Sequence, residues 1–240
     1  MGNHVGTVPA RVDNEPYFPP VKDQSRQGAC VGFATNTGIE ARMNYLNTPV
    51  EPLSNQGTYV LARCVDRVPT ANGVLPPLED EGSRPNQAMR ALTEWGIPLL
   101  SKRPDDDDTV NDEPTLDEIE SAAKFRVKGQ YEIKGYGKDR IDQIKNALAQ
   151  GFPLCFAVMV DTAFEEWDGR SPIGLPDPAD ILGGHYLCAM GYDTTHSGLI
   201  EVKFMNSWGV KWGSRGVGHG NEDFIRGMAS IYAMDIEVIK

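Results

Sequence analysis

The residues of this 240-residue chain that could do chemistry begin with a glutamine and a cysteine near its N-terminus. Gln24 stands six positions before Cys30, and a Gly-Ala pair directly precedes the cysteine. The segment that follows is apolar and small, without proline, to about Leu46, which predicts a helix beginning at Cys30. The unpaired amides and partial positive charge of a helix N-terminus favour a thiolate, so Cys30 could be a nucleophile. A buried cysteine acting as a small hydrophobic residue fits the same segment.

A thiol nucleophile needs a base, and the chain has only four histidines to compare. His4 lies in the N-terminal stretch, His196 in a predicted turn and His219 in a predicted loop. His185 alone lies in an apolar, strand-like segment, directly after two glycines that let another backbone or a substrate approach closely. We therefore predict that His185 is the base.

An asparagine can be placed opposite this histidine by counting through the predicted hairpin. If the turn is centred between Thr195 and His196, position 185 faces position 206, which is asparagine. A bulge would shift this count by one. Asn206 could then hold the imidazole of His185 through one ring nitrogen and leave the other for Cys30. A core histidine satisfied by a neighbouring amide would look the same.

The elements that must position these residues change in character along the chain. Residues 1–20 carry four prolines and are predicted to form an extended N-terminal strap. Helical patterns dominate residues 21–124, which carry the nucleophile, and strand-like segments dominate residues 125–240, which carry the histidine and the asparagine. This order predicts an α+β fold whose two lobes form one catalytic domain with a cleft between them.

Individual elements follow from local signals. The predicted helices cover about 30–46, 54–67, 85–95, a short stretch after Thr115 and 139–150, and the predicted strands cover 125–134, 153–160, 185–192, 199–206 and 230–238.

Charge limits the partners of the chain. The formal net charge is −11, with acidic residues concentrated at 105–120, which argues against nucleic acid and against an anionic membrane. The proline-bounded segment 102–114 is predicted to be a solvated acidic loop.

Cysteine usage and hydropathy indicate a compartment. Cys30, Cys64, Cys155 and Cys188 fall at no metal-ligand or paired spacing, and the last three lie in apolar runs typical of reduced core thiols. The chain begins with no signal peptide and has no 18-residue apolar run. These features predict a cytoplasmic, reducing location, with no metal and no cofactor.

The motifs resemble, in order, those of the papain-like cysteine peptidases, the C1 family. Residues 24–33 resemble the family's oxyanion-hole glutamine and nucleophile segment, residues 183–185 its histidine motif, and residues 206–209 its Asn-Ser-Trp-Gly segment. The similarity runs from about residue 8 to the last strand. It implies a helical left lobe and a β-barrel-like right lobe, with the active site in the cleft between them.

The resemblance also implies a role for each motif residue. Cys30 would be the nucleophile and His185 the base, oriented by Asn206; Trp208 would shield that contact from water, and Gln24 with the Cys30 amide would form the oxyanion hole. The resting enzyme would hold a thiolate–imidazolium pair, with a thiol pKa lowered to roughly 3–4, the range known for papain itself.

The sequence departs from the family pattern around the nucleophile. Val31 stands where an aromatic residue is usual. Gln27 replaces the cysteine of a family disulfide, and the partner cysteine expected near Asp80 is also missing. These departures fit a reduced, intracellular relative.

The expected substrate-binding residues also differ from the family. Gly82 and Ser83 take the place of paired glycines that bind the substrate backbone, and Gly184 precedes the histidine. Arg84 replaces an apolar pocket residue, and it either reaches that pocket to select an acidic substrate side chain or lies in solvent.

The sequence therefore predicts a cysteine endopeptidase that cleaves polypeptides through an acyl-enzyme. Only about twenty residues precede the first motif, so the resemblance is to propeptide-free bacterial or phage members, with a regulatory protein or flanking domain in place of a propeptide. Two alternatives stay open. Val31 and Ser83 would suit a catalytically weak polypeptide-binding module, and an amidase or transglutaminase-like acyl transferase would use the same Cys–His site.

Overall fold

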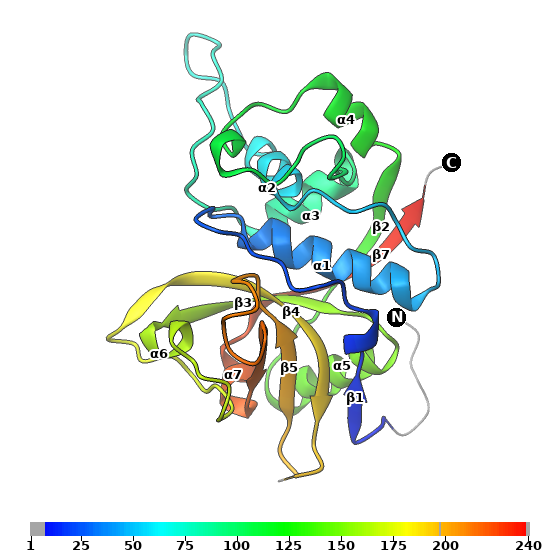
Figure 1. Cartoon of the computed structure of the whole chain (residues 1–240), viewed down its shortest axis with the longest axis vertical. Helices are drawn as coiled ribbons and strands as arrows, with labels where there is room; N and C mark the ends of the chain where they lie inside the picture. Colours follow the sequence, from blue (N-terminus) through cyan, green and yellow to red (C-terminus); the bar gives the residue numbers. More distant parts are fainter. Residues whose placement is uncertain (1–7, 197, 239–240) are drawn as a thin grey trace.

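The structure is a computed structural model, and it describes residues 8–196 and 198–238. Helix α1 (Cys30–Tyr45) crosses the middle of the molecule, with the other helices of the first half on one side and most of the sheet on the other (Figure 1). The helical side also contains α2 (Asn55–Cys64), α3 (Pro85–Glu94) and α4 (Leu116–Ala122). The α+β class predicted from the sequence is confirmed.

Local signals explain where these helices begin. Ser54 caps α2, because its hydroxyl accepts a hydrogen bond from the Gly57 amide at 2.8 Å. Thr115 and Glu118 form the predicted capping box of α4. Pro85 occupies the first turn of α3, where a missing amide hydrogen costs nothing.

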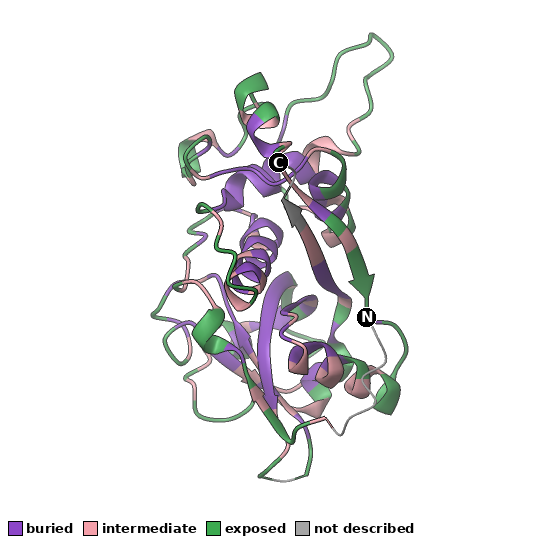
Figure 2. Cartoon of the chain, turned by 90° about the vertical axis from the view of Figure 1, so that its right-hand side faces the viewer, coloured by how far each residue is buried: buried purple, intermediate pink, exposed green. Residues whose placement is uncertain are grey.

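Helix α1 is buried on nearly all sides (Figure 2). A Cβ atom on Gly32 would lie 2.1 Å from the Asn55 carbonyl oxygen, so only glycine lets the start of α2 approach this closely. On the sheet side, Gly38 faces the sulfur atoms of Cys155 and Cys188. Small residues thus allow α1 to lie between α2 and the sheet, with Cys30 at its first position.

The second half of the chain forms one antiparallel sheet with the strand order β2-β7-β3-β4-β5-β6, and β1 pairs with the end of β4. The strands are β1 (Arg11–Asp13), β2 (Phe125–Glu132), β3 (Leu154–Asp161), β4 (Ile181–Asp193), β5 (Glu201–Met205), β6 (Val217–Gly220) and β7 (Ala229–Val238). The remaining helices are α5 (Gly137–Ala149), α6 (Thr162–Glu165) and α7 (Glu222–Gly227).

This sheet is open, so the barrel-like right lobe implied by the resemblance does not close. Strands β2 and β6 are its two edges. They stay apart because β2 and the end of β7 extend away from the other strands and reach the helical side of the molecule (Figure 1).

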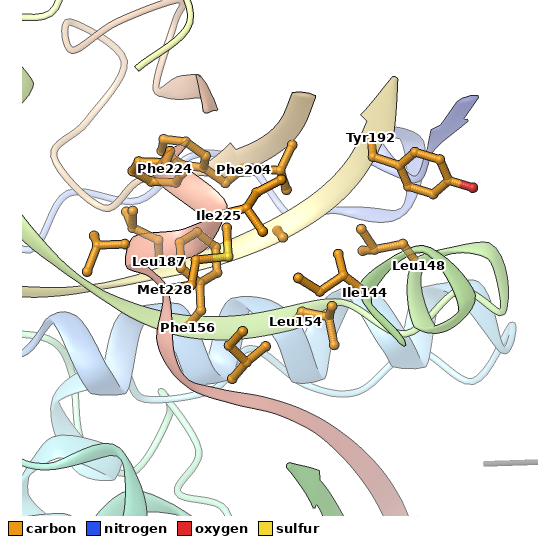
Figure 3. Close-up of a cluster of buried hydrophobic side chains, with 14 of the residues drawn as sticks. Ile144, Leu148, Leu154, Phe156, Leu187, Tyr192, Phe204, Phe224, Ile225 and Met228 are labelled. Carbon is orange, nitrogen blue, oxygen red and sulfur yellow. The ribbon is translucent and has the colours of Figure 1, made fainter. Parts of the chain in front are cut away.

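One hydrophobic core lies between the sheet and helices α5 and α7 (Figure 3). The rings of Phe204 and Phe224 stack with 5.2 Å between their centroids. The Phe156 ring meets both edge-on, at a centroid distance of 5.9 Å from each. Ring pairs of this geometry add to the stability that burial of their surface supplies.

A second core is shared by the two halves. Met89 and Leu92 of α3 belong to the same buried cluster as Val127 of β2 and Met234 of β7. The lobe boundary between residues 124 and 125 therefore stays a prediction, because the strands beyond it also support the helical side.

The predicted N-terminal strap is described from residue 8 onward, and residues 1–7 lie outside the described part. It contains the extended strand β1, and a short 3-10 helix at Glu15–Tyr17 interrupts its extended form. Tyr192 of β4 donates a hydrogen bond to the Pro9 carbonyl oxygen at 2.5 Å. The strap is thus tied to the longest strand.

The segment 102–114 is a mostly exposed loop, as predicted, but some of its acidic side chains bind other parts of the protein. Asp105 accepts a hydrogen bond from the Gln56 amide at 2.8 Å, at the N-terminus of α2, where the helix dipole favours a carboxylate. Asp107 accepts one from the side chain of Gln27, also at 2.8 Å. The acidic segment is therefore docked against α2 and the nucleophile segment.

Candidate active site

A cleft of about 980 Å³ lies where the helical and strand-rich sides meet. The sequence-predicted residues that line it are Gln24, Cys30, Gly82, Ser83, Arg84, Gly184, His185 and Trp208. Asn206 is the exception, because it lies buried behind His185. The fold therefore brings together residues that are up to 184 positions apart in the chain.

Cys30 is the first residue of α1, as the sequence predicts. Burial raises the pKa of its thiol, while hydrogen bonds from the backbone amides of Tyr186, Val31 and Cys30 itself act in the opposite direction. The amides at the start of the helix thus favour the thiolate, but burial has the larger effect.

His185 is held from two directions. Its Nε2 lies 2.7 Å from Oδ1 of Asn206, and the Trp208 indole stacks on the imidazole at 4.5 Å. The Ser207 amide donates to the same Oδ1 at 2.8 Å, which fixes the orientation of the asparagine amide. Because an amide oxygen can only accept, Nε2 of His185 carries the hydrogen, and Nδ1 is left as the basic nitrogen.

Burial also sets the charge of this histidine. It lowers the pKa of His185 to about 4, although the hydrogen bond to Asn206 acts in the opposite direction. Burial therefore disfavours the charged form of the Cys30 thiol and of the His185 imidazole alike. The predicted resting thiolate–imidazolium pair stays a prediction, because burial disfavours each of its charges taken alone and the attraction between the two charges acts in the opposite direction.

The His185–Asn206 contact is present, but the hairpin register predicted for it is wrong. Met205 pairs with Cys188, and β5 ends there, so Asn206 lies beyond the paired strand. The pairing begins at Asp193 and Glu201, which places the turn later than predicted, and a bulge follows Ala189. The side chain of Asn206 reaches the imidazole from the segment after the strand.

Gln24 is fixed by two hydrogen bonds. The Ser207 hydroxyl donates to its Oε1 at 2.5 Å, and its Nε2 donates to the Gln27 carbonyl oxygen at 2.8 Å. The amide nitrogen has a second hydrogen, and Gln24 lines the cleft. The predicted role of Gln24 in the oxyanion hole stays a prediction.

Gly82, Ser83 and Arg84 of the expected substrate-binding residues lie just before α3, whereas Gly184 lies in β4. Gly82 has φ of +87°, a conformation that favours glycine. Arg84 precedes the first residue of α3 and lines the cleft beside Asp66, whose pKa is lowered chiefly by hydrogen bonds from Gln87 and Arg90. Arg84 thus shares the cleft with acidic groups.

Sequence reasoning missed the acidic lining of the cleft, which consists of Asp66, Asp80, Glu81 and Glu165. Two of these carboxylates stand directly before Gly82, a position that could have drawn attention to them. Glu165 ends α6, a helix too short for its sequence to predict.

Within residues 8–196 and 198–238, no group of three or more His, Cys, Asp or Glu side chains is placed to hold a metal ion. No helix in that part of the chain is both long and apolar enough to cross a bilayer. The four cysteines are free thiols, and Cys64 is half-buried rather than fully in the core.

The fold and the cleft define the class of cysteine peptidases with a papain-like architecture. The sequence profile described as "Papain family cysteine protease" matches residues 8–226. The chain therefore belongs to the papain family of cysteine proteases.

Solved structures show the same fold. Xylellain, a cysteine protease from Xylella fastidiosa, superposes with a TM-score of 0.79 at 21% identity, covering 95% of this chain and 87% of that one. The bromelain protease from Ananas comosus gives a TM-score of 0.71 at 19% identity, covering 96% and 100%.

A viral relative is closer in sequence over part of the chain. An uncharacterised peptidase C1-like protein, L477 of Acanthamoeba polyphaga mimivirus, is 30% identical over 146 residues. The alignment covers 58% of this chain and 46% of the viral protein, so it spans less than half of that relative.

Proposed function

We propose that this chain is an endopeptidase that cleaves polypeptides through a covalent thioester on Cys30. The observation that carries the proposal is the His185–Asn206 contact of 2.7 Å under Trp208, in a cleft that Cys30 also lines. This contact leaves Nδ1 of the imidazole as the base on the cleft side. A base, an orienting group and a sulfur nucleophile are the parts that thiol peptidases require.

In the first step His185 takes the proton of the Cys30 thiol as the sulfur attacks the substrate carbonyl carbon. Burial disfavours a charge on either group alone, so the proton passes from the sulfur to the imidazole within the pair. The carbonyl oxygen becomes negative and accepts hydrogen bonds from the Gln24 side chain and the Cys30 amide.

The C–N bond then breaks, and His185 gives its proton to the leaving amine. The remaining thioester is hydrolysed by water, which His185 deprotonates in turn, and the thiol is restored. Trp208 covers the His185–Asn206 contact and keeps water from it.

The charges of the cleft favour substrates with lysine or arginine near the scissile bond. Among the described residues that line the cleft, Arg84 is the one cation, whereas four residues are carboxylates. Among the described residues, Glu81 and Glu165 form no ion pair, so both are available to a basic side chain. The predicted selection of an acidic side chain by Arg84 is disfavoured, because these carboxylates would repel it.

The test is cleavage of a denatured, lysine-rich protein by the wild type and by Cys30→Ala. We expect Cys30→Ala to lose at least about 10³-fold in kcat/KM, since no thioester can form. Cys64→Ala is the matched control, because Cys64 is a half-buried thiol outside the cleft, and it should keep full activity. Equal cleavage by wild type and Cys30→Ala would contradict the proposal, and binding without cleavage by wild type would indicate a binding module.

The predicted regulatory protein or flanking domain and the cytoplasmic location stay predictions. A polypeptide substrate is the partner that the cleft itself supports.

A further inference from the structure

A buried tyrosine and a carboxylate connect the nucleophile segment with the segment expected to bind the substrate backbone. Oδ1 of Asp80 accepts hydrogen bonds from the Gly28 amide at 2.9 Å and from the Tyr59 hydroxyl at 2.7 Å. The same hydroxyl accepts one from the Gly82 amide at 2.9 Å. Gly28, Asp80 and Gly82 all line the cleft, whereas Tyr59 lies beneath it with 0% of its surface exposed.

The directions of these hydrogen bonds follow from their chemistry. A backbone amide can only donate, so the Tyr59 oxygen accepts from Gly82 and its single hydrogen goes to Asp80. Burial, together with the hydrogen bond to the Asp80 carboxylate, raises the pKa of Tyr59 and keeps this hydrogen in place.

The two connected segments pack too closely to leave room for a side chain at Gly28. A Cβ atom on Gly28 would lie 3.0 Å from both Asp80 Oδ1 and the Gly82 amide nitrogen. Behind them, the Arg63 guanidinium lies over the Tyr59 ring at 4.0 Å and donates to the Glu79 carbonyl oxygen at 2.6 Å. Helix α2 thus holds the segment around Gly82 from below through two side chains one turn apart.

We propose that Tyr59 and Asp80 are positioning residues that fix the Gly82 segment relative to Cys30, so that a bound peptide backbone lies with its scissile carbonyl at the sulfur. This inference rests on the proposed function, because it assigns the two residues to peptide binding. Neither side chain is expected to touch the reacting atoms.

The test compares Tyr59→Phe with the wild type in two reactions. Cleavage of a tetrapeptide substrate needs the Gly82 segment, whereas alkylation of Cys30 by iodoacetamide does not. We expect KM for the tetrapeptide to rise about tenfold with little change in kcat, the size expected for losing one buried hydrogen-bond partner. The alkylation rate should stay within about twofold, because the phenylalanine ring preserves the packing.

Three further variants make the comparison specific. Tyr192→Phe removes another buried hydroxyl, one that donates to Pro9 far from the cleft, and should change neither reaction. Asp80→Asn keeps an oxygen that can accept from Gly28 and Tyr59, so its KM should lie well below that of Asp80→Ala. An unchanged KM in Tyr59→Phe, or an equal loss in cleavage and alkylation, would overturn the positioning role.

Hydrogen exchange separates this inference from the proposed function. We expect the amides of residues 79–84 to exchange at least about tenfold faster in Tyr59→Phe, since the Gly82 amide loses its acceptor. A wild-type protein that cleaves no peptide contradicts the proposed function alone. Unchanged exchange at residues 79–84 would then contradict the positioning role.

Discussion

The two walls of the cleft are built by different means. On the strand side, His185 lies in an aromatic cluster, stacked on Trp208 and edge-on to Phe164, with Trp212 packed behind them. On the helical side, irregular segments next to Cys30 are held by hydrogen bonds that backbone amides donate to side-chain oxygens. Packing therefore controls the charge of the imidazole, while hydrogen bonds control where the substrate backbone lies.

This difference separates the expected effects of mutation. Changes on the strand side should alter kcat and its pH dependence, because they alter the base. Changes on the helical side should alter KM, because they move the backbone that binds the substrate. Substitutions on the two walls therefore test whether the base and the substrate backbone are controlled separately.

The largest effect is expected at Asn206 on the strand side. Asn206→Ala removes the acceptor that fixes the His185 tautomer, so kcat should fall about 10²-fold while KM changes little. Some activity should remain, since His185 can still accept the thiol proton in a poorer orientation. Steady-state kinetics on the tetrapeptide measure both constants, and wild-type kcat in Asn206→Ala would show that the 2.7 Å contact has no role in catalysis.

A smaller, pH-dependent effect is expected at Trp208. Activity needs neutral His185, and burial lowers its pKa to about 4, so activity should be present above that pH and fall as the pH drops through it. Trp208→Ala admits water and raises this pKa, so the acidic limb of the pH–activity profile should move to higher pH. At pH 5 the activity of the variant should then be about tenfold below its own plateau at higher pH. Trp167→Ala is the control, because Trp167 packs on Trp212. If the activity of Trp208→Ala falls at the same acidic pH as that of the wild type, the indole does not control the charge of His185.

The smallest effect is expected from the cleft carboxylates. Glu81→Gln and Glu165→Gln should each lower kcat/KM for a lysine-containing peptide about threefold at low salt, and less at high salt. Glu51→Gln, which changes an exposed carboxylate outside the cleft, should have no effect. A cleavage rate that does not depend on peptide charge would contradict the preference for basic substrates.

The sequence predicted the elements with strong local signals. The start of α1 at Cys30 follows from a proline-free apolar run, and the capping of α2 by Ser54 follows from the type of the residue. Strand β6 was not predicted, because its glycines Gly218 and Gly220 give no strand pattern. They are needed where the rings of Phe204 and Phe224 cover the backbone.

The parts of the site that the sequence could not predict depend on contacts between distant residues. The charge of His185 follows from burial under Trp208, which local pattern does not reveal. The acidic segment appeared solvated because the groups it binds, on α2 and at Gln27, lie far away in the chain. The asparagine was identified through a register that proved wrong, since the turn position could not be read from residue types alone.

The measurement that tests the central claim most directly is the pH dependence of Cys30 alkylation by iodoacetamide, in the wild type and in His185→Gln. If His185 takes the thiol proton, labelling of the wild type should rise through about pH 4 and stay level above it. In His185→Gln, labelling should need a higher pH than an ordinary free thiol, because burial raises the pKa of the Cys30 thiol and no base takes its proton. Cys64 serves as the internal control, since burial also raises the pKa of its thiol. Identical profiles for Cys30 in the two proteins would contradict the account.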